Sequence, residues 1–181
     1  MGFLHLTILG IIQGLTEFLP VSSSAHLILL PALLGWQDQG IVYDVAVHTG
    51  SLGAVMLYFH KDIQGMLVGG LACFNAGSQN KDYLLWYIVL AAIPVGFSGL
   101  LLHDFVSTSL RDPRVIASAS IGFGLLLWWA DKYGAQTRSR AEIQWRDALL
   151  IGIAQAVAII PGTSRSGITI TAGLMLGMDR Q

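Results

Sequence analysis

The chain has 181 residues, of which 54% are hydrophobic and 12% are charged, and its formal net charge at pH 7 is −1. A soluble domain carries about 25% charged residues, so this composition excludes a water-soluble globule and predicts a protein surrounded by membrane lipids. The chain lacks the basic excess that nucleic-acid binding requires, and its single cysteine, Cys73, excludes an internal disulfide and a cysteine-rich metal site.

The first apolar region, residues 3–35, is interrupted by Pro-Val-Ser-Ser-Ser-Ala-His at 20–26. Each half is too short to cross a membrane alone, because a spanning helix needs roughly 17–25 apolar residues. The region has neither the leading basic residues nor the small-residue cleavage site of a signal peptide. Residues 1–35 are therefore predicted to form a re-entrant helical hairpin.

Three transmembrane helices are predicted within residues 43–131, at about 43–60, 83–103 and 114–131. Their interiors are rich in Gly, Ala and Ser, and aromatic residues gather near their ends, as is typical of helices packed in lipid. Pro94 predicts a kink in the second of them. Residues 63–76 are apolar but short, which favours an interfacial or partly buried helix.

A second broken apolar region occupies residues 147–178, around Pro-Gly-Thr-Ser-Arg-Ser-Gly at 161–167. Aligning Pro20 with Pro161 superposes Ser23 on Ser164 and leaves the flanking matches one residue out of phase. Because three crossings separate the two hairpins, the second is expected to enter from the opposite face.

The fold predicted for residues 1–181 is therefore a single all-α integral membrane domain, built as an inverted-topology repeat with two re-entrant helical hairpins plus transmembrane helices. The chain ends just after the second hairpin, so we expect the remainder of the second repeat to be missing.

Basic residues in short loops predict the orientation. The expected loops 61–82 and 132–146 carry six Lys or Arg residues, whereas the loops on the other side carry Arg111, with Arg114 at the edge. The first side is therefore predicted to be cytoplasmic, and the first hairpin to open outward.

Gln13 and Glu17 lie four residues apart, so they share one face of the first helix. A carboxylate within a membrane costs a few kcal/mol, roughly, unless it faces a cavity, a metal or a partner. Both residues are candidate metal ligands. The alternative is a hydrogen bond within the helix bundle.

The first interruption offers the hydroxyls of Ser22, Ser23 and Ser24 together with His26. A helix that begins near Ala25 would direct its positive end into the break. His26 beside Ser23 or Ser24 would supply the base and the hydroxyl that nucleophilic chemistry requires. Simple helix capping is the alternative.

Arg165 lies in the second interruption, and an arginine at membrane depth indicates a bound anion, because its planar fork matches phosphate oxygens. The surrounding Gly162, Thr163, Ser164 and Ser166 are candidate substrate-binding residues. An ion pair between Arg165 and Glu17 is the structural alternative. The loop is not a Walker A motif, because no lysine follows its second glycine.

Asp44 and His48 also lie four residues apart, near the outer end of the first predicted span. They are expected to form either a second layer of residues around the site or an interfacial pair, and the interfacial pair is favoured.

Two segments, Gln-Gly-Leu-Thr-Glu-Phe-Leu-Pro-Val-Ser-Ser-Ser-Ala-His at 13–26 and Pro-Gly-Thr-Ser-Arg-Ser-Gly at 161–167, resemble the signature motifs of the undecaprenyl pyrophosphate phosphatase (bacitracin-resistance protein) family. The resemblance covers all 181 residues. It implies an enzyme that uses Mg²⁺ or Ca²⁺ to remove the terminal phosphate of a polyprenyl pyrophosphate lipid. It also implies a multi-pass protein of the bacterial inner membrane whose site opens to the outer face, with a homodimer left open.

By position, the resemblance assigns Gln13 and Glu17 to the acidic motif, although Gln13 stands where some members have Glu. Ser23 matches the nucleophile, His26 the motif histidine and Arg165 the phosphate-binding arginine. Ser24 replaces a threonine and keeps the hydroxyl.

Two other functions remain open at this stage. A secondary transporter also uses inverted repeats, broken helices and a midplane polar site. A lipid phosphatase working through a phosphohistidine is less favoured, because no histidine follows Arg165.

Overall fold

The computed structural model describes residues 2–75, 77–110 and 112–180, and these are helical apart from loops and one isolated bridge between Arg138 and Met178. The elements are α1 (Phe3–Thr16), α2 (Ser23–Leu34), α3 (Ile41–Tyr58), α4 (His60–Ala72), α5 (Leu84–Ser109), α6 (Pro113–Tyr133), the 3₁₀ turn η1 (Arg140–Glu142), α7 (Trp145–Ala156), the 3₁₀ turn η2 (Val157–Ile159) and α8 (Arg165–Met175).

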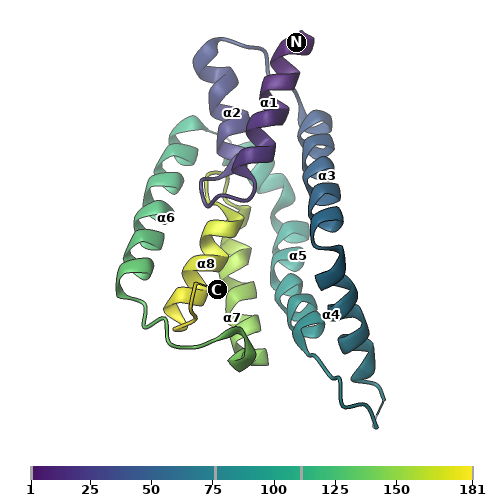
Figure 1. The fold of residues 1–181 in the computed structure, drawn as a ribbon. Coiled ribbons are helices and arrows are strands. Elements are labelled where there is room, and N and C mark those ends of the chain that lie inside the picture. Colours follow the sequence, from purple (N-terminus) through teal and green to yellow (C-terminus); the bar gives the residue numbers. More distant parts are fainter. Residues whose placement is uncertain (1, 76, 111, 181) are drawn as a thin grey trace.

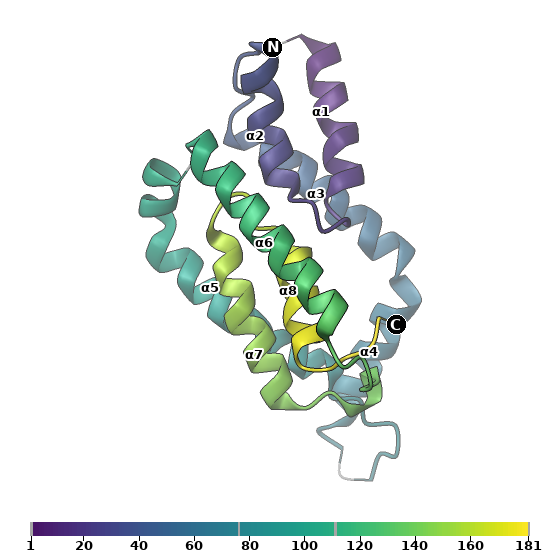
Figure 2. The same cartoon turned by 90° about the vertical axis from the view of Figure 1, so that its left-hand side faces the viewer.

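Two helical hairpins, α1–α2 and α7–α8, enter the molecule from opposite ends and turn back near its middle (Figures 1 and 2). The loop between α1 and α2 and the loop between α7 and α8 therefore lie near one another. Helix α5 packs along α7, and α6 packs along α8, so the longer helices flank the second hairpin. This arrangement brings the two polar interruptions of the sequence together.

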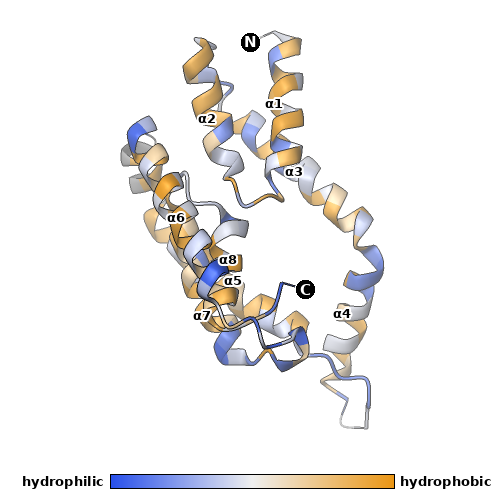
Figure 3. Ribbon diagram, turned by 60° about the vertical axis from the view of Figure 1, so that its left-hand side comes forward, coloured by the Kyte–Doolittle hydropathy of each residue, from blue (hydrophilic) through white to orange (hydrophobic). Residues whose placement is uncertain are grey.

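Three helices, α3, α5 and α6, are long and apolar enough to cross a membrane. They cover the three predicted spans, and the chain is an all-helical integral membrane protein. Large apolar side chains along the helices are widely exposed, for example Phe3 at 87% and Leu100 at 85%, as expected for surfaces that face lipid. Hydrophilic residues gather mainly where the chain passes from one helix to the next (Figure 3).

The second predicted span, at about 83–103, ends too early: residues 104–109 continue α5, because nothing between Pro94 and Ser109 stops the helix. The short helix predicted at 63–76, within the expected loop 61–82, is present as α4, which begins earlier, directly after Phe59. Arg111, which entered the prediction of orientation, lies outside the described residues.

Close packing of α7 against α5 fixes the second hairpin. A Cβ atom added to Gly152 would lie 2.5 Å from the carbonyl oxygen of Ala91 and 2.7 Å from its Cα. Only a residue without a side chain permits this approach between two helix backbones, as is common where helices pack in lipid.

Gly152→Ala is therefore expected to destabilise the protein by about 1–3 kcal/mol, because the Ala91 backbone cannot move away from the new methyl group. The matched control is Gly96→Ala in α5, where the added Cβ meets nothing within 4 Å. Unfolding of both variants in detergent measures the difference. Equal stability of the two would contradict the packing argument.

An ion pair anchors the start of the second hairpin. Arg138 donates to both carboxylate oxygens of Asp147, at 3.1 and 2.6 Å, and also to the carbonyl oxygen of Leu176 at the end of α8. The hydrogen bond to Asp147 raises the pKa of the Arg138 guanidinium, which stays charged. The loop before α7 and the end of α8 are thereby held together.

Candidate functional site

The polar contacts at the connection between α1 and α2 converge on one carboxylate oxygen. Oε2 of Glu17 accepts a hydrogen bond of 2.6 Å from the Ser23 hydroxyl and one of 2.9 Å from the Gln13 side-chain amide. It also lies 3.5 Å from Nε2 of His48, which comes from α3. Gln13 is fully buried. The carboxylate is therefore held in one position and points at the serine hydroxyl.

Both polar loops end at a capped helix. Ser22, which precedes α2, accepts from the Ala25 backbone N–H, and Ser164, which precedes α8, accepts from the Gly167 N–H. The residue that follows each cap is one of the predicted catalytic residues: Ser23 begins α2 and Arg165 begins α8. The N-terminal ends of both helices carry partial positive charge, which favours an anion nearby.

The structural correspondence between the hairpins differs by one residue from the expected alignment. Ser22, not Ser23, corresponds to Ser164, because these two are the helix caps. Each cap also contacts the serine two residues further on, Ser24 at 3.3 Å in the first loop and Ser166 at 3.0 Å in the second. The expected alignment matched the two prolines, but Pro20 lies two residues before its cap, Ser22, whereas Pro161 lies three residues before Ser164.

The same one-residue shift removes the discrepancy in the flanking segments. It superposes the Gly-Ile-Ile-Gln segment at 10–13 on Gly-Ile-Ala-Gln at 152–155. It also superposes Gly35 on Gly177, and both glycines follow their helices with positive φ, at 65° and 81°.

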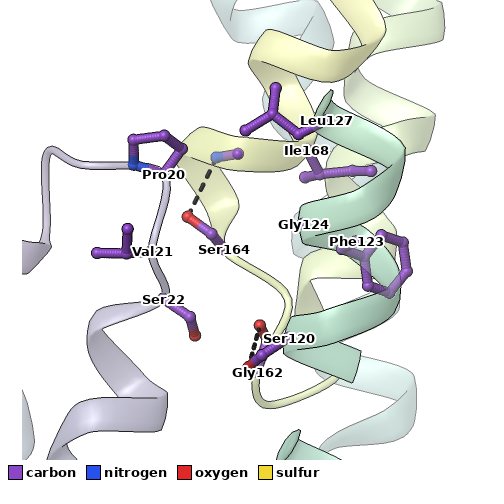
Figure 4. A pocket seen from close by; sticks show the side chains of 11 residues that line it. Pro20, Val21, Ser22, Ser120, Phe123, Gly124, Leu127, Gly162, Ser164 and Ile168 are labelled. Carbon is purple, nitrogen blue, oxygen red and sulfur yellow. Dashed lines mark hydrogen bonds between the residues drawn. The ribbon is translucent and has the colours of Figure 1, made fainter. Parts of the chain in front are cut away.

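The two loops are in contact. The Ser166 hydroxyl donates to the carbonyl oxygen of Leu19 at 3.2 Å, which ties the second hairpin to the first. Gly162 has φ of +96° and packs so closely on the Ile116 carbonyl that no side chain fits there, and its own carbonyl accepts from the Ser120 hydroxyl. Figure 4 shows this contact region, with Pro20 to Ser22 on one side and Gly162 and Ser164 on the other.

A small polar cavity of about 70 Å³ lies between the loops. Eight of the predicted site residues line it, joined by His48 and Ala158. The lining comprises Glu17, Ser22, Ser23, Ser24, His48, Ala158, Thr163, Ser164, Arg165 and Ser166. Gly162 instead supports the loop, and Gln13 lies behind Glu17. Glu17, at the end of α1, and the two interruptions thus bring an acid, hydroxyls and a cation to one cavity.

The structure does not bring His26 to this cavity. Its side chain is exposed, and Nδ1 lies 2.8 Å from the carbonyl oxygen of Ser22, one turn back along α2. The Ser23 hydroxyl donates to Glu17, so the expected contact between His26 and the nucleophile is replaced by a contact with the carboxylate. The role of His26 stays a prediction.

His48, which comes from α3, is the histidine that lines the polar cavity. Its Nδ1 lies 2.7 Å from the Asp44 carbonyl oxygen, and its Nε2 faces Glu17. The four-residue spacing of Asp44 and His48 was the only sequence signal for this contribution.

Arg165 is exposed and lines the polar cavity together with two larger clefts. Among the described residues it forms no direct ion pair with Glu17, although its charge acts on that carboxylate. The guanidinium therefore lies near the acid and the hydroxyls while its hydrogen-bond donors remain open to an anion.

An apolar cleft of about 570 Å³ adjoins the polar cavity, sharing Glu17, His48 and Arg165 with it. Phe18 and the α3 residues Val45, Leu52 and Val55 form its apolar walls. A molecule with an anionic head and a hydrocarbon chain matches this combination of surfaces.

The site provides some of the ligands that a divalent cation requires. Among the described residues, no three His, Cys, Asp or Glu side chains form a metal-binding group. Magnesium, however, is often held by one or two carboxylates plus substrate phosphates, and Glu17 provides such an oxygen beside the anion site. The buried Oε1 of Gln13 has no hydrogen-bond partner. It would join Glu17 as a ligand only after the amide turns, since Nε2 now faces Glu17.

The family model described as bacitracin resistance protein BacA matches residues 6–181. The chain belongs to the BacA family. It is 54% identical to the undecaprenyl-diphosphatase of Magnetococcus marinus and 53% identical to undecaprenyl-diphosphatase 1 of Pseudoalteromonas translucida. The whole chain is covered in both comparisons, together with 69% and 68% of the respective relatives. The undecaprenyl-diphosphatase of Nitrosococcus oceani is also 53% identical to the chain.

Proposed function

We propose that this chain hydrolyses undecaprenyl pyrophosphate to undecaprenyl phosphate and inorganic phosphate, which recycles the lipid carrier for cell-wall synthesis and underlies bacitracin resistance. Membership of the BacA family and the names of its relatives support this activity over the transporter alternative. The geometric observation that carries it is the 2.6 Å hydrogen bond from Ser23 to Glu17, in a cavity that Arg165 also lines.

Glu17 is placed to accept the proton of the Ser23 hydroxyl. Removal of that proton would make Oγ a nucleophile toward the terminal phosphorus, or would let Ser23 orient an attacking water molecule. In both routes one water molecule is consumed overall. The bond between the terminal phosphorus and the bridging oxygen breaks, and the bridging oxygen leaves with undecaprenyl phosphate.

Arg165 and the two helix N-termini stabilise the negative charge that grows on the phosphate oxygens in the transition state. Arg165 begins α8 and Ser23 begins α2, so both act from rigid helical positions. The neighbouring backbone N–H groups supply further partial positive charge. The apolar cleft along α3 would hold the first part of the prenyl chain.

A divalent cation, Mg²⁺ or Ca²⁺, would be held by Glu17, with Gln13 as a second ligand, and would neutralise pyrophosphate charge when bound. Without such charge, the carboxylate would repel the substrate. The support is the cluster of oxygen atoms around Glu17 and the unpaired amide oxygen of Gln13.

The two hairpins are further proposed to be re-entrant halves of an inverted repeat whose turns meet within the bilayer. Their entry from opposite ends of the molecule (Figure 1), the matched serine caps and the matched glycines support this topology. The distribution of basic residues supports a site that opens to the outer face of the bacterial inner membrane. A homodimer stays a prediction.

Phosphate release from a prenyl pyrophosphate tests the function directly. Purified protein in detergent is expected to release inorganic phosphate in the presence of Mg²⁺ or Ca²⁺ and to lose that activity in EDTA. Proteoliposomes loaded with labelled substrate provide the second arm. Transport of intact substrate without phosphate release would favour the transporter and contradict the proposal.

His48 is expected to position Glu17 for the reaction. His48→Ala removes the contact at 3.5 Å and should lower turnover by about tenfold, equivalent to about 1.4 kcal/mol of barrier. The control is His60→Ala, because His60 makes the same kind of contact with a helix carbonyl, 2.8 Å from Leu57 O, and does not line the polar cavity. Equal turnover of His48→Ala and His60→Ala would show that His48 does not position Glu17 for the reaction.

A further inference from the structure

A second polar groove lies at the opposite end of the molecule from the N-terminus (Figure 1). It has a volume of about 610 Å³ and is formed between the start of α5 and the turn η1. The groove shares no lining residue with the polar cavity or with the apolar clefts beside it. The proposed hydrolysis therefore does not use it.

Two cations reach this groove from distant parts of the sequence, Lys81 and Arg140. Neither forms a hydrogen bond or an ion pair with the described residues. Asp82 also lines the groove, and its Oδ1 already accepts from the Leu84 backbone N–H at 2.9 Å. The adjacent Glu142 carboxylate accepts from the backbone and hydroxyl of Ser139. These hydrogen bonds occupy the carboxylate oxygens but leave their charge, so the two cations and one carboxylate that line the groove give it a net charge of +1.

Aromatic residues also line the groove. Tyr83 and Tyr87 line it and stack on each other, with ring centroids 6.3 Å apart. Tyr83 directly precedes α5 and Tyr87 lies in its first turn, and the apolar stretch of α5 from Leu84 to Leu102 is long enough to cross a membrane. Tyrosines at the end of such a helix sit at the level of the lipid headgroups. Ile143 adds an apolar wall beside them.

We propose that this groove binds the phosphate headgroup of an anionic membrane phospholipid. Lys81 and Arg140 would contact the phosphate oxygens from two sides, and a tyrosine hydroxyl would donate a further hydrogen bond. The apolar groups of Tyr87 and Ile143 would accompany the first part of an acyl chain. A lipid is favoured over free phosphate because the cations lie where a spanning helix meets the headgroup layer.

Lipid binding to the purified full chain in detergent, followed by native mass spectrometry, tests this site. The wild type is expected to bind phosphatidylglycerol about tenfold more tightly than phosphatidylcholine. The double variant Lys81→Gln/Arg140→Gln should lose that preference while its unfolding temperature is unchanged. Inorganic phosphate at the same concentration should not displace the lipid.

The matched control is Lys132→Gln/Arg146→Gln, which removes the same charge from side chains that lie over the rings of Trp128 and Trp145 and do not line the groove. This control should keep the preference. Equal loss in both double variants would show diffuse charge attraction, and full displacement by inorganic phosphate would show a free-anion site. Either result would overturn the proposal. Phosphate release does not enter the measurement, so the proposed function is tested separately.

Discussion

Glu17→Gln is expected to lower phosphate release by about 10³-fold, equivalent to roughly 4 kcal/mol of barrier, while the protein still folds and inserts. In the structure, Oε2 of Glu17 accepts from Ser23 and Gln13 and faces His48. An amide keeps the shape of the side chain but has no charge for a cation and a much weaker tendency to accept the Ser23 proton. The substitution therefore removes the base and the metal ligand together.

Steady-state phosphate release and divalent-cation binding by the purified variant would check this result. Glu142→Gln is the control, because Glu142 is exposed and its carboxylate caps the turn at Ser139. Turnover of the control should equal that of the wild type. Near-normal turnover of Glu17→Gln would show that neither the proton nor the cation is held by this carboxylate.

The helices were largely predictable, since long apolar stretches bounded by polar residues have few alternatives. The region around residues 60–109 shows the limit of that approach. The span predicted at about 43–60 ends earlier, at Tyr58, and His60 already begins α4, whereas α5 runs past its apolar stretch to Ser109. Hydropathy reports which residues tolerate lipid, whereas helix ends depend on backbone capping and on neighbouring helices.

The residue types of the site were also predictable, but their contacts were not. Two interruptions rich in Ser, Gly and Pro indicated a shared polar site, and eight of the predicted residues do line one cavity. Residue type alone did not show which histidine joins them. His26 lies in the first turn of α2, and its Nδ1 contacts the Ser22 carbonyl oxygen instead of a serine hydroxyl. His48 joins the site through the packing of α3 on α1, for which the four-residue spacing of Asp44 and His48 was the only local signal.

Arg165→Lys is expected to lower turnover by about 10²-fold or more, roughly 2.7 kcal/mol of barrier. Lysine keeps the charge but loses the planar pair of donors that contacts two phosphate oxygens at once. Arg165 begins α8 beside the capping Ser164, so its guanidinium projects from a fixed point into the cavity that contains Glu17 and Ser23. The single ammonium group of lysine cannot make the two parallel contacts that the guanidinium makes with the phosphate.

The structural alternative, an ion pair between Arg165 and Glu17, predicts the opposite pattern. Lysine would then restore most of the activity, and Arg165→Ala would unfold at a lower temperature because Glu17 would be left unpaired. The phosphate-clamp assignment predicts instead that Arg165→Ala unfolds at the wild-type temperature, since no direct pair with Glu17 exists among the described residues and Glu17 keeps its hydrogen bonds to Ser23 and Gln13. Turnover and thermal unfolding of both variants in detergent, with Arg146→Lys as the control outside the cavity, separate the two. Retained activity in Arg165→Lys together with early melting of Arg165→Ala would make Arg165 a scaffold residue.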